Sequence, residues 1–204
     1  LTPTHTYAKH GVYTVALTVT DNHLASSSDT LTVTVMSALG CASEALDTLT
    51  PYVVPSKRIE KAAQAVAASL APGYWTDEMH VHAKEGHKVF SELHKAVQEL
   101  QQALKDAGKE KLSAAAASAA HEAMAHILCA AQLLAETVYL ENEGLVAAQA
   151  KHQQAVNHAL AQAQAALDEG DAEVMAGKND NAAQSYRQSW QKTQEALELA
   201  AKTN

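Results

Sequence analysis

The sequence has few aromatic and few basic residues, and both shortages narrow what the protein can be. Aromatic residues make up only 4% of its 204 residues, whereas 47% are hydrophobic and much of that share is alanine. Small side chains let helix axes approach closely, so this composition favours packed helices over a thick β-sandwich. The net charge is −8. We therefore expect no nucleic acid partner, because such a partner requires a basic face.

Long uncharged runs are also missing. The most apolar stretch, 112–134, is interrupted by His121, Glu122 and His126. We therefore expect no membrane insertion. The chain begins at Leu1 without a visible signal peptide, so we expect a processed form or part of a longer chain, and the missing signal says nothing about the compartment.

Cysteine is scarce, with two residues that match no metal-ligand spacing. Cys41 and Cys129 are a candidate disulfide if the protein folds in an oxidising compartment. The alternative is two buried thiols that act as small hydrophobic side chains.

Two segments near the N-terminus alternate apolar residues with threonines, which predicts strands. They are Val12–Thr20 and Thr30–Val35, joined by a polar connection at 21–29. Two strands need a third strand or a packing partner to be stable in water. The candidate strand-assembly face consists of the apolar residues that period two places together: Tyr13, Val15, Leu17, Val19, Leu31, Val33 and Val35.

Four short motifs follow one another in this region, and both their residues and the spacing between them are informative. They are HTY at 5–7, GVYTV at 11–15, LTVTD at 17–21 and TLTVTV at 30–35. They resemble the closing half of a PKD domain, an immunoglobulin-like module common in secreted and surface proteins. The sequence departs from the family at His23-Leu24, where small residues and glycine are usual. The family's earlier strands, with their Trp-x-Phe-Gly-Asp-Gly segment, are absent from the sequence.

An immunoglobulin-like sandwich has about seven strands, so two leave the fold incomplete. Two explanations remain open. The other strands precede the sequence considered, or a neighbouring subunit supplies them by strand addition. The second explanation would make the chain a polymerising subunit.

After Met36 the apolar spacing becomes helical. The fold class is therefore α+β and mostly α: a partial PKD or immunoglobulin-like β-domain at 1–36, a junction at 37–41, and an antiparallel alanine-rich helical bundle at 42–204. We expect breaks at 108–111, Gly144 and Gly170-Asp171, with a further interruption at Gly86 left open. The expected helices are 42–49, 55–71, 77–107, 112–139, 145–167 and 181–202.

Motifs in the helical region are also familiar. YWTDEMH at 74–80 precedes GHKVF at 86–90, and ALDEG at 166–170 precedes Ala182, Tyr186 and Trp190. They resemble a helical module found near the ends of bacterial and archaeal secreted proteins, with a tetratricopeptide-like closing hairpin. The resemblance implies secretion and architecture, and no activity.

The eleven histidines raise a metal hypothesis, centred on Asp77, Glu78, His80, His82 and His87. On a helix His80 and His82 point about 200° apart, so only a loop would bring them to one ion. We expect these residues instead to cap and line a helix start. The seven-residue spacing of His80, His87 and His94 predicts one helix face. The pair His121 and His126 is five residues apart, which excludes the zincin motif.

No catalytic or cofactor-binding motif occurs, so we expect neither an enzyme nor a cofactor. The sequence predicts a secreted or cell-surface structural module, such as a subunit of a filament, sheath or surface layer. Its partners would be copies of itself or other surface proteins. The alternatives are an accessory region of a larger secreted enzyme and a histidine-based metal-binding protein.

Overall fold

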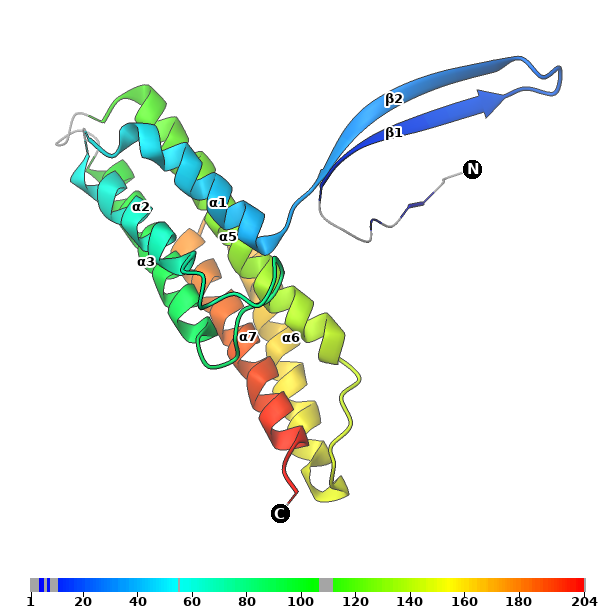
Figure 1. Cartoon of the computed structure of the whole chain (residues 1–204). Helices are drawn as coiled ribbons and strands as arrows, with labels where there is room; N and C mark the ends of the chain where they lie inside the picture. The colour runs from blue at the N-terminus through cyan, green and yellow to red at the C-terminus, as the bar shows by residue number, and fades with distance from the viewer. Residues whose placement is uncertain (1–3, 6, 8–10, 55, 107–111, 204) are drawn as a thin grey trace. The chain divides into compact units, whose positions relative to one another are not determined.

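The computed structural model describes residues 4, 5, 7, 11–54, 56–106 and 112–203. In this part of the chain the predicted α+β, mostly helical class is confirmed, with one two-stranded sheet followed by six α-helices. The contacts divide the chain after Ser37 into a β-unit and a helical unit (Figure 1). The predicted turn at 108–111 and the predicted helix start at Pro55 lie outside the described residues.

The β-unit consists of β1 (Gly11–Thr20) and β2 (Ser26–Val35), paired antiparallel. The second strand begins four residues earlier than predicted, because Ser26–Asp29 pair in register with Leu17–Thr20. In one of these pairs the hydroxyls of Thr18 and Ser28 are hydrogen-bonded at 2.7 Å. The connection is therefore only Asp21–Ala25, not 21–29.

The helical unit contains α1 (Ala38–Leu49), α2 (Lys57–Ser69), α3 (Gly86–Lys105), α5 (Ala114–Asn142), α6 (Gln153–Met175) and α7 (Asn179–Ala200). Two short 3-10 helices, Thr50–Tyr52 and Ala150–His152, follow α1 and precede α6. α1 packs on α5, α2 on α3, and α6 on α7, while α5 also contacts α3, α6 and α7 (Figure 1). α5 is thus the central helix.

One helix of the described chain, α5, has the length and apolar composition to cross a membrane. Half of its most apolar window is buried inside the bundle. A core helix of a bundle passes the same test, so this is weak evidence for a membrane span.

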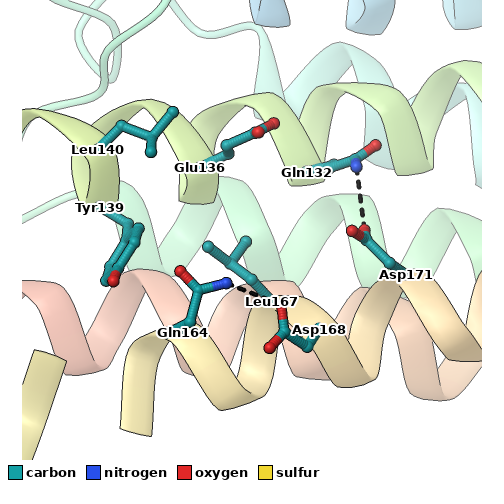
Figure 2. A pocket seen from close by; sticks show the side chains of 8 residues that line it. All are labelled: Gln132, Glu136, Tyr139, Leu140, Gln164, Leu167, Asp168 and Asp171. Carbon is teal, nitrogen blue, oxygen red and sulfur yellow. Dashed lines mark hydrogen bonds between the residues drawn. The ribbon is translucent and has the colours of Figure 1, made fainter. Parts of the chain in front are cut away.

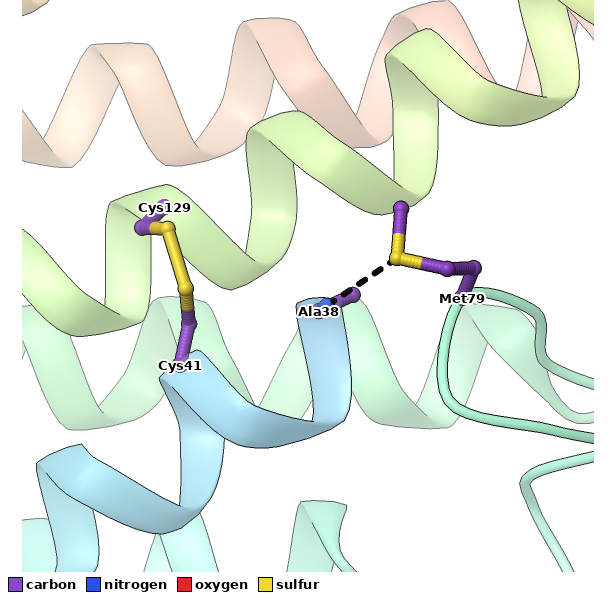
Figure 3. The surroundings of a disulfide bond; sticks show 4 residues. All are labelled: Ala38, Cys41, Met79 and Cys129. Atoms are coloured by element: carbon purple, nitrogen blue, oxygen red, sulfur yellow. Dashed lines mark hydrogen bonds between the residues drawn. A yellow bond between two sulfur atoms is a disulfide. The ribbon is translucent and has the colours of Figure 1, made fainter. Parts of the chain in front are cut away.

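The start of α1 differs from the prediction of a junction at 37–41. The first amides of a helix have no partner within the helix and need one elsewhere. Here the amide of Leu39 donates to the Glu78 carbonyl at 3.0 Å, and that of Ala38 donates to the Met79 sulfur at 3.4 Å (Figure 3). A distant loop therefore caps α1, which lets the helix begin directly after Ser37.

The predicted helix from Asp77 is wrong over its first nine residues. The Asp77 carboxylate accepts the backbone amides of Met79 and His80, at 2.8 and 2.9 Å, and such local bonds compete with helix formation. Trp75 and Val81 then form an isolated antiparallel bridge. Because His80 lies in this loop, the predicted helix face of His80, His87 and His94 does not exist.

The segment before α6 also differs from the prediction, which began that helix at Leu145. α6 begins only at Gln153. The Gln153 side chain accepts the Ala147 amide at 2.8 Å and donates to the Leu145 carbonyl at 3.1 Å. These bonds hold 145–149 as a connection against the helix start.

Gly170 does not break its helix, because α6 continues through it to Met175. The glycine is a contact point instead. A Cβ at this position would lie 2.6 Å from Cε1 of Tyr186 on α7. Tyr186 is buried, and its hydroxyl donates to Asp171 at 2.8 Å, so the ring is held in place.

We predict that Gly170→Ala destabilises the bundle by about 2 kcal/mol, the usual range for overpacking a core. Helix propensity alone would favour alanine by about 1 kcal/mol, so a loss identifies the Tyr186 contact as its cause. Urea unfolding measures the effect. The matched control is Gly144→Ala, where a Cβ meets nothing within 4 Å. Equal or higher stability of Gly170→Ala would contradict the prediction.

Cys41 of α1 and Cys129 of α5 are joined by a disulfide in the structure, with Cα atoms 6.0 Å apart (Figure 3). Both helices lie in the same unit, so the bond crosses the interface between α1 and α5, and the buried residues of α1 run from Ala38 to Leu49. The bond links positions 88 residues apart.

Closing so long a loop restricts the unfolded chain strongly. We predict that Cys41→Ala with Cys129→Ala lowers the free energy of unfolding by about 4 kcal/mol. Reducing the wild-type protein should have a similar effect, whereas the reductant should leave the double variant unchanged. Unfolding that does not respond to reductant in the wild type would contradict the prediction.

Candidate functional site

The candidate site is the two-stranded sheet, because one of its faces carries seven apolar residues and three of them are more than half exposed. Facing residues of an antiparallel pair share one side of the sheet. The register pairs Tyr13 with Val33 and Val15 with Leu31. Leu17 and Val19 lie on this same side by period two. All seven residues of the candidate strand-assembly face are therefore brought together, Val35 opposite Gly11 completing the set.

This face is unevenly exposed. Near the base of the sheet Tyr13, Val15, Val33 and Val35 are half-buried. Tyr7 contributes to their cover, with its ring centroid 4.6 Å from that of Tyr13. Nearer the turn the apolar side chains are more exposed. Three of them are each more than half exposed: Leu17 at 54%, Leu31 at 58% and Val19 at 62%.

The opposite face has a different chemistry. Most of its cross-strand pairs are hydroxyl residues, such as Thr14 with Thr32 and Thr20 with Ser26. All these side chains are exposed. Threonine suits a solvated strand because its β-branch fits the pleat and its hydroxyl faces water. The sheet therefore has one face richer in apolar residues and one richer in hydroxyls, although Asp29 and Ser27 lie opposite Leu17 and Val19 on the first and the exposed Val12 lies on the second.

The turn keeps the two strands in this register. The Asp21 carboxylate accepts the amides of His23 and Ala25, at 2.8 and 2.9 Å, and the Asp21 amide donates to the Ala25 carbonyl at 2.9 Å. Leu24 has a φ of +67° and is 86% exposed. In the sequence His23-Leu24 departs from the PKD pattern, but leucine gives no signal for a positive φ.

A second feature is a small pocket between α5 and α6, with a volume of about 100 Å³ (Figure 2). Its acidic residues are largely engaged within the protein. Asp171 accepts from Gln132 at 3.0 Å and from Tyr186, and Asp168 accepts from Gln164 at 2.7 Å. Burial and then the nearby Asp171 raise the pKa of Tyr186, so its hydroxyl remains a donor. The hydrogen bonds of Asp171 thus link α6 to α5 and α7 beside this pocket.

The residues of the metal hypothesis are only partly brought together. His80 contacts Asp77 and Glu141, while His82 and His87 are exposed at other positions. Within the described residues no group of three or more histidine, cysteine or acidic side chains is arranged to hold a metal ion.

The positive φ of Leu24 in the turn leads to a testable prediction. A positive φ costs leucine about 1 kcal/mol, whereas glycine adopts it freely. We predict that Leu24→Gly stabilises the sheet by up to about 1 kcal/mol, measured as slower amide exchange in β1 and β2. The control is Ala25→Gly, where φ is not positive and the substitution should only loosen the turn. Faster exchange in Leu24→Gly would contradict the prediction.

Comparison with known proteins bears on this sheet alone. The model of the PKD domain family matches residues 1–35, which include β1 and β2. No curated protein and no solved structure matches the chain. The match supports the resemblance of the first 36 residues, and no comparison supports the resemblance of the helical region. Residues 1–35 are therefore similar to a PKD domain, which indicates an extracellular immunoglobulin-like module.

Proposed function

We propose that this protein is a non-catalytic extracellular module that assembles with copies of itself through its sheet, as the subunit of a filament, sheath or surface layer does. The observation that carries the proposal is the uncovered apolar face of β1 and β2, on which Leu17, Val19 and Leu31 are each more than half exposed. The helical unit would act as a spacer or second contact surface.

The energetics of a two-stranded sheet support this proposal. Such a sheet is at best marginally stable by itself in water, and further strands or a packing partner stabilise it. Burial of apolar surface contributes roughly 25 cal/mol per Å², and full burial of a leucine or valine side chain about 1.5–3 kcal/mol. Covering Leu17, Val19 and Leu31 is therefore worth several kcal/mol to whatever supplies the cover.

The cysteines support the extracellular part. Disulfides persist in oxidising compartments and are rare in a reducing cytosol. Cys41 and Cys129 are bonded in the core of the helical unit, with Cys41 fully buried. Together with the PKD match, this bond is consistent with a protein that folds outside the cytosol.

Sedimentation velocity over a concentration series tests the assembly. We predict that the wild-type chain associates, and that Leu17→Lys weakens its association at least tenfold, because an ammonium group opposes burial of the face (about 1.4 kcal/mol or more). The matched control is Ala16→Lys, which places the same charge one residue away on the exposed hydroxyl face and should associate like the wild type.

Two results would reject self-assembly. One is a wild-type chain that stays monomeric at every concentration while amide exchange shows β1 and β2 folded. The other is equal weakening by Leu17→Lys and Ala16→Lys. A monomer of this kind would instead favour an accessory region of a larger secreted enzyme, in which strands of the same polypeptide complete the sandwich.

A further inference from the structure

His80 has a carboxylate at each of its two ring nitrogens. Nδ1 lies 2.8 and 2.9 Å from the carboxylate oxygens of Asp77, and Nε2 lies 3.1 and 3.0 Å from those of Glu141. An ionised carboxylate only accepts hydrogen bonds, so both nitrogens must donate. Only the protonated imidazolium has two N–H donors. Asp77, His80 and Glu141 are called the His80 clamp below.

The surroundings of the His80 clamp favour the cation. Burial alone lowers the pKa of His80, but the hydrogen bonds and charges of Asp77 and Glu141 outweigh it, and the pKa lies above its usual 6.5. Asp77 comes from the same loop and Glu141 from α5. These two are the titratable groups that act on His80 in the described chain. Glu141 also lies in the last turn of α5, where the helix dipole favours a positive charge.

Asp77 is held in its ionised form, which complements a cationic His80. Partial burial raises the pKa of Asp77. A larger opposite effect comes from its hydrogen bonds with the amides of Met79 and His80 and with the His80 ring, so the pKa lies below its usual 3.8. The carboxylate therefore stays ionised over the whole range in which His80 titrates. The protonation state of His80 then decides whether both carboxylates accept a hydrogen bond from its ring.

The His80 clamp holds the cap of α1. Glu78 and Met79 lie between Asp77 and His80 in the chain. The Glu78 carbonyl accepts the amide of Leu39. The Met79 sulfur accepts the amide of Ala38 (Figure 3). Asp77 organises this short segment from within, and Glu141 ties it to the central helix α5. The first turn of α1, which follows the β-unit directly in the chain, depends on the same segment for its hydrogen-bond partners.

We propose that Asp77, His80 and Glu141 form a proton-operated clamp, which holds the cap on the first turn of α1 and releases it when His80 loses its proton. A neutral imidazole has one N–H, so one carboxylate would then face a nitrogen lone pair. The segment 77–80 would lose either its tie to Glu141 of α5 or the contact between the His80 ring and Asp77. The backbone amides of Met79 and His80 would still donate to Asp77. This inference concerns the helical unit alone and does not depend on the proposed assembly.

The direction of the pH effect follows from the raised pKa of His80. The stabilisation is complete below the unfolded value of 6.5 and is lost as the pH rises through the higher folded value. Release therefore occurs on the alkaline side. For each unit by which folding raises this pKa, opening of the segment should become about tenfold more frequent between the two limits.

Amide hydrogen exchange of the intact chain tests the clamp, with the Leu39 amide as the reporter because it donates to Glu78. Exchange is measured from about pH 6 to about pH 9 and corrected for its intrinsic pH dependence. We expect protection of Leu39 to fall across this range in the wild type. His80→Gln and Glu141→Gln should show weak protection with little pH dependence, because each removes one side of the ion pair.

The matched control is His158→Gln, which makes the same substitution at an exposed histidine of α6 and should keep the wild-type profile. NMR titration of the wild type should give His80 a pKa above the ordinary histidine value of 6.5. A Leu39 protection that does not change with pH would overturn the clamp. So would a His80 pKa at or below 6.5, or a wild-type pH profile in folded Glu141→Gln.

Discussion

Close approach of helices at small residues is the constraint on which the bundle depends. Two aromatic rings of α7 lie against glycines of neighbouring helices: Tyr186 against Gly170 of α6, and Trp190 against Gly86 of α3. A Cβ at Gly86 would lie 2.3 Å from the indole of Trp190. With only 4% aromatic residues, the protein uses its few large rings where a neighbouring backbone leaves room for them.

The contact at Gly86 lies where the preceding loop ends. Trp190 of α7 occupies the space beside Gly86, the first residue of α3, and the chain between Ser69 and Gly86 is a loop. This loop carries Asp77, Met79 and His80, which reach the start of α1 and the end of α5. The cap of α1 therefore comes from a loop that is distant from α1 in the sequence.

How much the sequence predicts depends on how local the determining interaction is. The strands were predictable because period two is written in consecutive residues, and the apolar face follows from that period. The extension of β2 to Ser26 was not, since serines give a weak strand signal and their pairing depends on partners in β1. The helical break expected at Gly170 was wrong because a glycine that accommodates a distant ring looks the same in sequence as one that ends a helix.

The same distinction applies to His80. Its seven-residue spacing from His87 suggested a helix face, yet the Asp77 carboxylate directs the local backbone into a loop. Its second partner, Glu141, is 61 residues away. No local pattern contains that pairing, so the sequence groups Asp77 with His80 but gives no signal that Glu141 joins them.

The two units differ in how their stability is supplied. The helical unit buries its own apolar residues and adds a disulfide between α1 and α5, so its stability comes from contacts within itself. In the described part of the β-unit, by contrast, Leu17, Val19 and Leu31 remain exposed although their pattern is that of a buried face. In β1 the apolar residues recur at period two on one side of the sheet, and in β2 they do so from Leu31 to Val35, whereas Ser27 and Asp29 occupy that side nearer the turn. If the sheet assembles as proposed, its stability and its function rest on the same contact, whereas the helical unit buries its apolar residues within itself.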